Sequence, residues 1–308
     1  QIRANWQTTR AAVINQAAMN WIDSTWTPAL SSTQPLFLFL YYFDPHTWYD
    51  PPPPYATLYD PTYTGTFTTA VYADSENVVN GTLIPSARDV EYLQALYDGE
   101  ITYWDSQLGV LLNFLETRHV LDNSLIIVTS DHGELFGEHG QWTHRNSVYE
   151  EALHVPLIMR YTGVISAGLH ITEPVQLTDV TPTILDWLSL SIPPGLDGQS
   201  LKPLTQGVHP TQPRAIFSEI DAITNPSVPG YWLALRYELR AVRQGDWKYI
   251  YTIGLTSSDA LYALQPASLY ETNNVILSEP ATASMLRQLL IDKFRLLTLF
   301  TDMAVIAR

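Results

Sequence analysis

A carboxylate and an imidazole are adjacent in the sequence at Asp131 and His132, and two residues separate them from an apolar, β-branched run at residues 125–128. Such a run predicts a buried strand, and Gly133 then lets the chain turn away. Open α/β folds place their ligand sites at the carboxyl ends of strands. A carboxylate with an imidazole suits Mn²⁺ or Zn²⁺, whereas Ca²⁺ prefers oxygen atoms alone. The pair therefore predicts two ligands of a divalent metal ion, with simple turn chemistry as the alternative.

Three more side chains have types that could act beside such an ion. His46 follows a second apolar run, residues 36–43, through an Asp-Pro turn. His144 lies further along the loop that begins at Asp131, and Arg145 follows it directly. A histidine changes its charge near neutral pH, whereas an arginine stays charged. The alternative for His46 is an ordinary surface-loop histidine.

Periodic apolar residues predict the elements that position these side chains. Three- and four-residue spacings predict amphipathic helices, and unbroken apolar runs predict strands covered on both faces. The predicted elements are helices at residues 3–22, 88–116, 147–152 and 175–189, and strands at residues 36–43, 125–129 and 155–160. Helix 88–116 is long enough to cross a whole sheet, at about 1.5 Å per residue. Together these elements predict an open α/β core with a mainly parallel sheet.

The sequence pattern changes after Pro203. Short alternating segments predict strands at residues 215–218, 238–243, 248–252 and 260–264, with a Gly-Asp hairpin turn at residues 245–246. A last helix is expected at residues 281–300. Lys248 in the hairpin is interpreted as a solvated strand residue. These signals predict two domains: an α/β core at residues 1–205 and a small antiparallel sheet with a covering helix at residues 206–308.

Composition excludes several classes of function. The 308 residues are 46% hydrophobic, which allows a sizeable core, and they carry a net charge of −15. So acidic a chain lacks the basic face that nucleic acids or anionic membranes require. The absence of Cys excludes disulfides, thiolate nucleophiles and Cys-bound zinc. Neither a bilayer-spanning apolar run nor a signal peptide is visible near the start. The sequence begins at Gln1 without an initiator Met, so we interpret it as a processed or partial chain.

An ordered set of motifs resembles the sulfatases of the alkaline phosphatase superfamily. The matching segments are Phe-Asp-Pro-His at 43–46, Tyr-Asp-Gly-Glu-Ile at 97–101, Ser-Asp-His-Gly-Glu at 130–134, Gly-Glu-His-Gly at 137–140, Tyr-Glu-Glu at 149–151, Thr-Asp-Val-Thr-Pro-Thr at 178–183, Leu-Asp-Gly-Gln-Ser-Leu at 196–201 and Gly-Asp-Trp-Lys-Tyr at 245–249. They extend over nearly the whole chain. Ala263 departs from the pattern, because the family usually has Asp there.

The resemblance implies a fold and a set of roles. The fold is a three-layer α/β/α arrangement with a mixed sheet, incomplete at its N-terminal side, followed by the small antiparallel sheet and its helix. Asp131 and His132 would bind one divalent ion: Ca²⁺, or Mn²⁺ or Zn²⁺, because the family often has Asn at the position of His132. His46 and His144 would act in catalysis, at the leaving group or on the anionic oxygens, and Arg145 would bind substrate.

The nucleophile of the family is missing from the sequence. It lies in a Cys/Ser-x-Pro-x-Arg motif, and neither Ser32 nor Ser86 begins one. The paired Asp residues of the family's first strand are missing too. The resemblance therefore implies a metal-dependent hydrolase of sulfate, phosphate or phosphonate esters, whose nucleophile and remaining metal ligands come from an N-terminal part or a partner chain.

Two other functions stay open at this point. One is a catalytically inactive sulfatase-like subunit with a structural or binding role in an assembly. The other is a transferase that moves phosphoryl groups to lipids or envelope polymers. In each case we expect an unpaired edge on the N-terminal side of the sheet, since little of the chain precedes residues 36–43 to cover it. Family habit favours an extracytoplasmic location.

Overall fold

The computed structural model describes residues 10–26, 34–67, 77–79, 81–144, 147–221, 238–253, 259–264 and 270–294. Two compact units interleave along the chain. The first consists of Gln1–Ile126, Phe136–Thr143 and Arg160–Thr162, and the second of Ile127–Leu135, His144–Met159 and Gly163–Arg308. All of residues 206–308 therefore belong to the second unit. The predicted division into domains at residues 1–205 and 206–308 stays a prediction.

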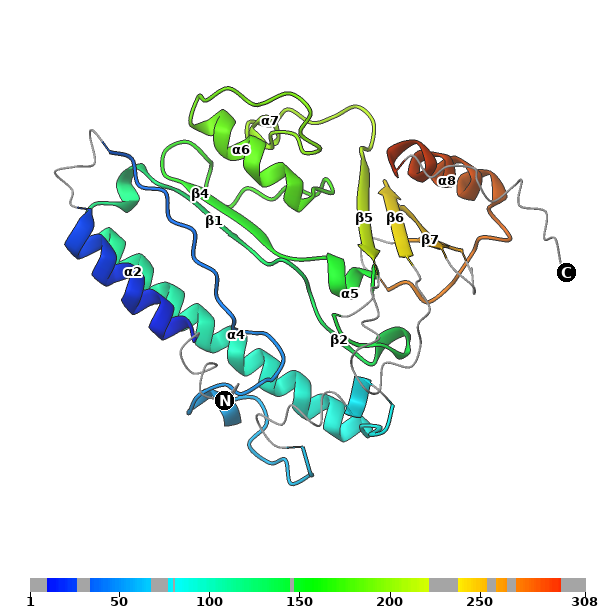
Figure 1. The fold of residues 1–308 in the computed structure, drawn as a ribbon, viewed down its shortest axis with the longest axis horizontal. Helices are drawn as coiled ribbons and strands as arrows, with labels where there is room; N and C mark the ends of the chain where they lie inside the picture. Colours follow the sequence, from blue (N-terminus) through cyan, green and yellow to red (C-terminus); the bar gives the residue numbers. More distant parts are fainter. Residues whose placement is uncertain are drawn as a thin grey trace, which may run out of the picture. The chain divides into compact units, whose positions relative to one another are not determined.

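Two helices that run side by side build the first unit (Figure 1). Helix α2 spans Ala11–Thr25, and helix α4 spans Ala87–Glu116. Their apolar faces share one core with the short helix η3 (Leu121–Asn123); its buried residues are Ile22, Trp26, Leu111, Leu115 and Leu121. The predicted helix at residues 88–116 is confirmed. The helix predicted at 3–22 is found as α2, and residues 1–9 lie outside the described residues.

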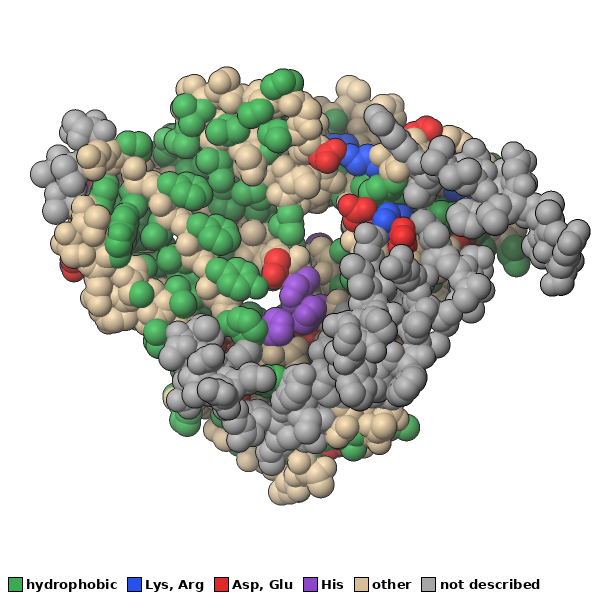
Figure 2. Space-filling view, in the orientation of Figure 1, with side chains coloured by type: hydrophobic (Ala, Val, Ile, Leu, Met, Phe, Trp, Pro, Cys, Tyr) green, Lys and Arg blue, Asp and Glu red, His purple; other side chains and the backbone are tan. Residues whose placement is uncertain are grey.

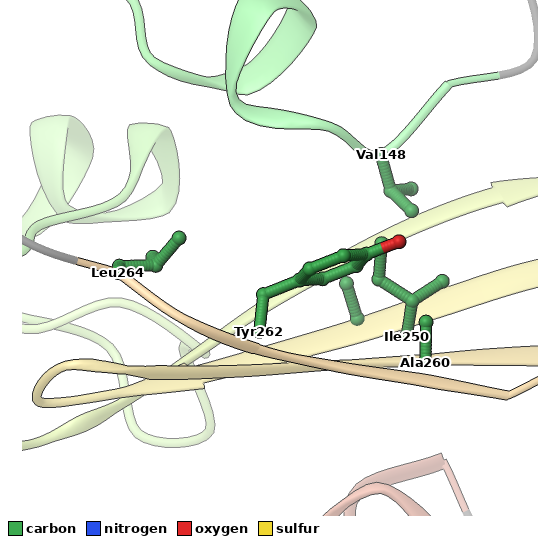
Figure 3. Close-up of a cluster of buried hydrophobic side chains, with 6 residues drawn as sticks. Val148, Ile250, Ala260, Tyr262 and Leu264 are labelled. Atoms are coloured by element: carbon green, nitrogen blue, oxygen red, sulfur yellow. The ribbon is translucent and has the colours of Figure 1, made fainter. Parts of the chain in front are cut away.

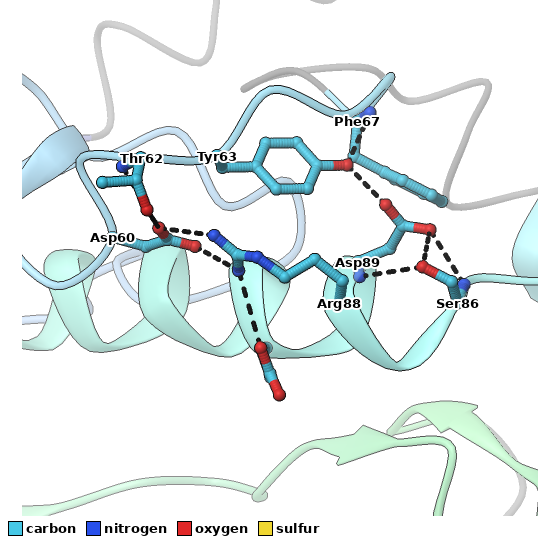
Figure 4. Close-up of polar contacts among 8 residues, drawn as sticks. Asp60, Thr62, Tyr63, Phe67, Ser86, Arg88 and Asp89 are labelled. Atoms are coloured by element: carbon cyan, nitrogen blue, oxygen red, sulfur yellow. Dashed lines mark hydrogen bonds and ion pairs between the residues drawn. The ribbon is translucent and has the colours of Figure 1, made fainter.

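The start of α4 is held by a capping box and by the loop that precedes it (Figure 4). The Asp89 carboxylate accepts a hydrogen bond from the Ser86 backbone N–H at 2.8 Å, and Ser86 Oγ accepts one from the Asp89 N–H at 3.3 Å. Tyr63 donates to the same carboxylate at 2.6 Å, and Arg88 donates to Asp60 at 2.7 Å. The loop beyond η2 (Tyr55–Thr57) is thus attached to the first turn of the long helix.

Residues 36–43 are extended but belong to no strand among the residues that the structure describes, so the prediction of a strand covered on both faces was wrong. Alternate side chains of an extended chain point in opposite directions. One set packs into the core of α2 and α4: Leu36, Leu38 and Leu40. The other set is exposed: Phe37 (75%), Phe39 (76%) and Tyr41 (56%). Figure 2 shows hydrophobic side chains spread over this face.

Four short strands lie on either side of the candidate metal pair in the sequence. Strand β1 (Leu125–Thr129) pairs with β4 (Leu157–Tyr161), and β2 (Leu135–Phe136) pairs with β3 (Trp142–Thr143). The turn between β2 and β3 contains the short helix η4 (Glu138–Gly140). The strands predicted at residues 125–129 and 155–160 are confirmed.

A four-stranded antiparallel sheet forms the main part of the second unit (Figure 1). Its strands, in spatial order, are β5 (Ala215–Asp221), β6 (Glu238–Gln244), β7 (Trp247–Ile253) and β8 (Ala260–Ala263). Helix α8 (Pro280–Phe294) packs on one face through Leu286 and Leu290. The other face buries Val148 against Ile250 and Tyr262 (Figure 3). The predicted strands, hairpin and final helix are confirmed for the described residues.

The remaining helices of the second unit are short. They are α5 (Glu150–Leu153), η5 (Leu177–Asp179), α6 (Val180–Trp187) and α7 (Lys202–Thr205). The buried Asp179 carboxylate ties this region together, because it accepts hydrogen bonds from the Gln176 and Gln199 N–H groups and from Arg214. Within the described residues, every helix is too short or too polar to cross a lipid bilayer.

Candidate functional site

The turn after β1 presents Asp131 and His132 at the end of the strand. Two side-chain hydrogen bonds shape it: Thr129 Oγ1 donates to the Pro156 carbonyl at 2.8 Å, and Ser130 Oγ donates to the His132 carbonyl at 2.7 Å. The backbone N–H of His132 donates to Asp131 Oδ1 at 3.2 Å. The carboxylate and the imidazole thus leave the strand end together, as the sequence predicts.

Gly133 lets this turn approach α5 more closely than any other residue would. Its N–H donates to the Ala152 carbonyl at 2.8 Å. A Cβ atom at this position would lie 2.1 Å from the Glu151 carbonyl oxygen. Real Cβ atoms do not approach so closely, so only glycine fits without a movement of backbone. The loop that carries Asp131 and His132 therefore rests directly on the backbone of α5.

His132 has its ring oriented by its own loop. Its Nδ1 lies 2.9 Å from the Gly133 carbonyl oxygen. A carbonyl only accepts, so Nδ1 carries the proton and the neutral ring has its lone pair on Nε2. Nε2 lies 3.8 Å from Asp131 Oδ1, and the two side chains are 30% and 58% exposed. An imidazole nitrogen and a carboxylate oxygen, both of types that bind metals, therefore lie close together on the same turn.

His144 stacks on His132, with ring centroids 3.8 Å apart and an angle of 21° between the planes. Its Nδ1 lies 3.1 Å from Glu134 Oε2, whose side chain is only 3% exposed. The carboxylate orients the imidazole, as outer-shell carboxylates do for the histidine ligands of metals. Two of the predicted residues are thus brought together, and Glu134 is a third member that residue-by-residue reasoning missed. Its signal was present, because Glu134 closes the Ser-Asp-His-Gly-Glu motif.

The donor set of this loop suits a divalent cation. His132 and His144 each offer a ring nitrogen, and these ligand atoms lie within 4.8 Å of each other. Asp131 adds an anionic oxygen next to His132. Nitrogen ligands favour Mn²⁺ or Zn²⁺ over Ca²⁺. Asp131 and His132 could hold the ion, and His144 could either join them or face an anionic group bound to it.

His46 belongs to the first unit and is held locally. Its Nδ1 lies 2.6 Å from the Thr47 carbonyl oxygen, and its ring packs on Phe43 at 4.4 Å between centroids. The preceding Asp44 is buried and accepts a hydrogen bond from the Ala11 N–H at 2.8 Å. His46 therefore has a defined orientation within its own unit. Arg145, the predicted substrate-binding residue, lies outside the described residues.

A buried acid supports the loop that follows His46. Glu100 in α4 is 1% exposed and accepts a hydrogen bond from the Asp50 N–H at 2.9 Å. Its second carboxyl oxygen is buried and has no hydrogen-bond partner among the described residues. Burial raises the pKa of Glu100 well above its usual range, and the nearby Asp44 carboxylate adds to this, against the opposing hydrogen bond from Asp50.

The raised pKa predicts a pH dependence of folding stability. Below the pKa of the unfolded chain, Glu100 is protonated in both states and contributes no pH dependence. Above it, Glu100 ionises in the unfolded chain but stays protonated in the folded one. The free energy of unfolding therefore falls as the pH rises towards the pKa of the folded state. Glu100→Gln keeps an oxygen acceptor for Asp50 and removes the ionisation. We expect its melting temperature to exceed that of the wild type by more at pH 8 than at pH 4.5. An equal difference at both pH values would contradict the assignment.

Two family models match the chain. The model described as "Sulfatase" matches residues 11–190, and the model described as "N-sulphoglucosamine sulphohydrolase, C-terminal" matches residues 137–292. The first contains Asp131, His132 and His144. The second begins shortly before His144 and covers the antiparallel sheet.

Curated relatives carry sulfatase names. Choline-sulfatase from Rhizobium meliloti (strain 1021) is 35% identical over 178 residues, which are 57% of this chain and 30% of the relative. Arylsulfatase K from Homo sapiens is 32% identical over 209 residues, 65% of this chain and 37% of the relative. Arylsulfatase K from Danio rerio is 30% identical over 283 residues, which are 82% of this chain and 50% of the relative. The chain thus spans about a third to a half of the length of these relatives.

Solved structures confirm the predicted fold class. The phosphonate monoester hydrolase from Silicibacter pomeroyi superposes with a TM-score of 0.71 at 28% identity, covering 93% of this chain and 60% of that one. A second structure, in complex with its substrate D-glucosamine-2-N,6-O-disulfate, gives a TM-score of 0.58 at 27% identity, covering 73% and 45%. The α/β architecture and the ordered motifs agree with these matches. The chain belongs to the sulfatase family of the alkaline phosphatase superfamily.

Proposed function

We propose that this chain supplies half of the site of a metal-dependent hydrolase that cleaves sulfate or phosphonate and phosphate esters. The observation that carries the proposal is the pairing of Asp131 and His132 at the end of β1, with His144 stacked on His132. Such a cluster can hold a divalent cation and present donors beside it. The names of the relatives, choline-sulfatase, arylsulfatase K and phosphonate monoester hydrolase, point to esters of sulfur and phosphorus oxyacids.

Each residue has a task in this proposal. Asp131 and His132 hold the ion through a carboxylate oxygen and Nε2. His144, oriented by Glu134, donates a hydrogen bond from Nε2 in its protonated form to a nonbridging oxygen of the ester. His46 protonates the leaving oxygen, and Arg145 binds the anionic group. The metal, when bound, polarises the ester and favours ionisation of a hydroxyl nucleophile.

The nucleophile comes from outside these 308 residues. The sequence has no Cys, and neither Ser32 nor Ser86 begins a Ser-x-Pro-x-Arg motif. The greater length of the relatives supports a further part that carries the nucleophile and the remaining carboxylates. The missing motif equally favours a catalytically inactive subunit, so activity has to be measured. An extracytoplasmic location stays a prediction.

The test uses the protein as encoded, this chain together with any segment that precedes it. Hydrolysis of 4-nitrophenyl sulfate and of a 4-nitrophenyl phosphonate monoester is measured with added Mn²⁺, Zn²⁺ or Ca²⁺. We expect metal-dependent turnover of at least one ester, and we expect Mn²⁺ to support it better than Ca²⁺. Binding of Mn²⁺ without turnover of either ester would contradict the hydrolase and favour the inactive subunit. Release of the 4-nitrophenol only when an alcohol acceptor is added would instead indicate a transferase.

A further inference from the structure

Four charged side chains form a buried cluster in the second unit, which we call the ion cluster: Glu150, Arg243, Lys248 and Glu271. Lys248 is 1% exposed, which corrects its interpretation as a solvated strand residue. Its Nζ lies 2.8 Å from Glu150 Oε1 and 2.9 Å from Glu271 Oε1. Arg243 lies 2.9 Å from Glu150 Oε2. Two cations thus face the carboxylates of Glu150 and Glu271, and a carboxylate oxygen of Glu151 lies within 4.8 Å of one of Glu271.

Burying charged side chains costs free energy, because they lose their contacts with water. Charges taken out of water contribute net stability only when each finds a close partner, and removing one member leaves a buried charge uncompensated. Burial works against the ionised form of Glu150, yet Lys248 and Arg243 together hold the pKa of that carboxyl below its usual range. Apolar residues of similar volume often stabilise a protein as well as a buried ion pair does. The cluster supplies something else, a defined direction for the element that it holds.

That element is α5. Glu150 is its first residue, and the Glu150 backbone N–H donates to Glu271 Oε2 at 2.6 Å. Arg243 and Lys248, on β6 and β7, hold the Glu150 side chain from the sheet. Val148, just before α5, is 1% exposed and inserts into the apolar face of the sheet (Figure 3). The short helix is therefore attached to the sheet by its backbone, its first side chain and the residue before it.

The other end of α5 holds the turn that carries Asp131 and His132, which we call the metal loop. The Ala152 carbonyl accepts the hydrogen bond from Gly133, and the Glu151 carbonyl lies directly against the Gly133 Cα. Gly133 follows His132 and sets the end of the turn that carries both predicted metal ligands. A shift of α5 by a few tenths of an ångström would therefore move the turn, because a glycine packed on backbone leaves no slack.

We propose that the ion cluster positions the Asp131–His132 loop through α5, so that Lys248 is a positioning residue for the metal site. The inference rests on the proposed function, because Asp131 and His132 are the proposed ligands of the metal ion. The connection itself, from sheet to helix to loop, is a property of the fold. It gives the antiparallel sheet a role beyond packing: it sets where the two metal ligands lie.

A matched pair of substitutions in the same sheet separates positioning from general stability. Lys248→Met removes the central cation of the ion cluster. Arg240→Met removes another buried cation of β6, which pairs with Glu238 at 3.1 Å and Glu219 at 3.3 Å. Both variants are expected to lower the melting temperature. Only Lys248→Met is expected to change the position of the metal loop.

Two readouts on the protein as encoded, this chain together with any segment that precedes it, report on the loop. The first is the hydrogen-exchange protection of the Gly133 amide, measured by NMR. The second is the Kd for Mn²⁺, measured by calorimetry. For Lys248→Met we expect the protection to fall about tenfold and the Kd to rise about tenfold, the size usual for loss of outer-shell support. For Arg240→Met we expect both within twofold of the wild type.

A rescue variant guards against simple misfolding. Lys248→Met combined with Glu271→Gln removes one buried negative charge together with the positive one, and it keeps an oxygen acceptor for the Glu150 N–H. We expect this double variant to recover most of the Gly133 protection. The proposal is overturned if Lys248→Met leaves Gly133 protection unchanged, if Arg240→Met lowers it equally, or if the double variant recovers none. If the wild-type protein, tested with any segment that precedes this chain, fails to bind Mn²⁺, the proposed metal function fails, while the exchange data still decide the positioning role.

Discussion

Replacement of Asp131 by alanine is expected to weaken Mn²⁺ binding by about 100-fold or more, since even outer-shell substitutions at metal sites cost about 10- to 100-fold. Asp131 supplies the anionic oxygen of the donor set, 3.8 Å from the ligand nitrogen of His132. Without it, this loop offers the cation ring nitrogens alone. The loop itself should survive, because its shape depends on Thr129, Ser130 and Gly133. We therefore expect an unchanged melting temperature in the absence of metal.

Calorimetric titration with Mn²⁺ measures this effect, and a matched aspartate serves as control. Asp122 is 70% exposed, and its Oδ2 lies 3.1 Å from His119 Nδ1. Asp122→Ala should bind Mn²⁺ as the wild type does. Asp131→Asn keeps one oxygen donor without the charge, so an intermediate affinity is expected. Equal Mn²⁺ affinity in Asp131→Ala and the wild type would refute the assignment of Asp131 as a ligand.

Gly133→Ala is expected to destabilise the chain by about 3 kcal/mol, at the upper end of the usual cost of overpacking. The new Cβ would lie 2.1 Å from the Glu151 carbonyl oxygen, 3.1 Å from its carbon and 3.4 Å from the Ala152 Cα. All three are backbone atoms, which no rotamer change can move away. Relief requires that the turn and α5 separate, which breaks the hydrogen bond from Gly133 to Ala152. Mn²⁺ affinity should fall with stability, because the same turn carries Asp131 and His132.

Urea unfolding checks the stability change, and Gly109→Ala is its matched control. Gly109 lies inside α4, and a Cβ there meets nothing within 4 Å. An alanine in an exposed helical position favours the helix by about 0.5–1 kcal/mol over glycine. The same substitution should therefore have opposite signs at the two positions. A Gly133→Ala variant as stable as the wild type would show that the turn and α5 separate at little cost.

Local patterns in the sequence were sufficient for most of the secondary structure. The helix at 88–116 could be predicted because its apolar residues repeat every three or four positions along its whole length. Tertiary contacts rarely override so long a periodic signal. The hairpin at residues 245–246 has a turn dipeptide between two alternating segments, and it forms as predicted. The direct succession of Asp131 and His132 after a strand likewise placed both side chains at one strand end.

Residues 36–43 show where local patterns reach their limit. An unbroken apolar run indicates that both sides of an extended segment favour burial, but it does not say what covers them. In the structure α2 and α4 cover one side, and Phe37 and Phe39 on the other remain exposed. Lys248 shows the opposite case. Its charge favours solvent, and only partners distant in sequence, Glu150 and Glu271, allow it to be buried.

By itself, the sequence determined the order of helices and strands, the family motifs and the Asp131–His132 pair, because each depends on neighbours along the chain. Only the tertiary structure decided that His144 stacks on His132, that Glu134 orients it, and that Gly133 lies against α5. These relations join segments separated by loops whose path depends on packing and hydrogen bonds. The geometry of the candidate metal loop therefore depends on the tertiary structure, whereas the types of its candidate ligands can be identified from the sequence.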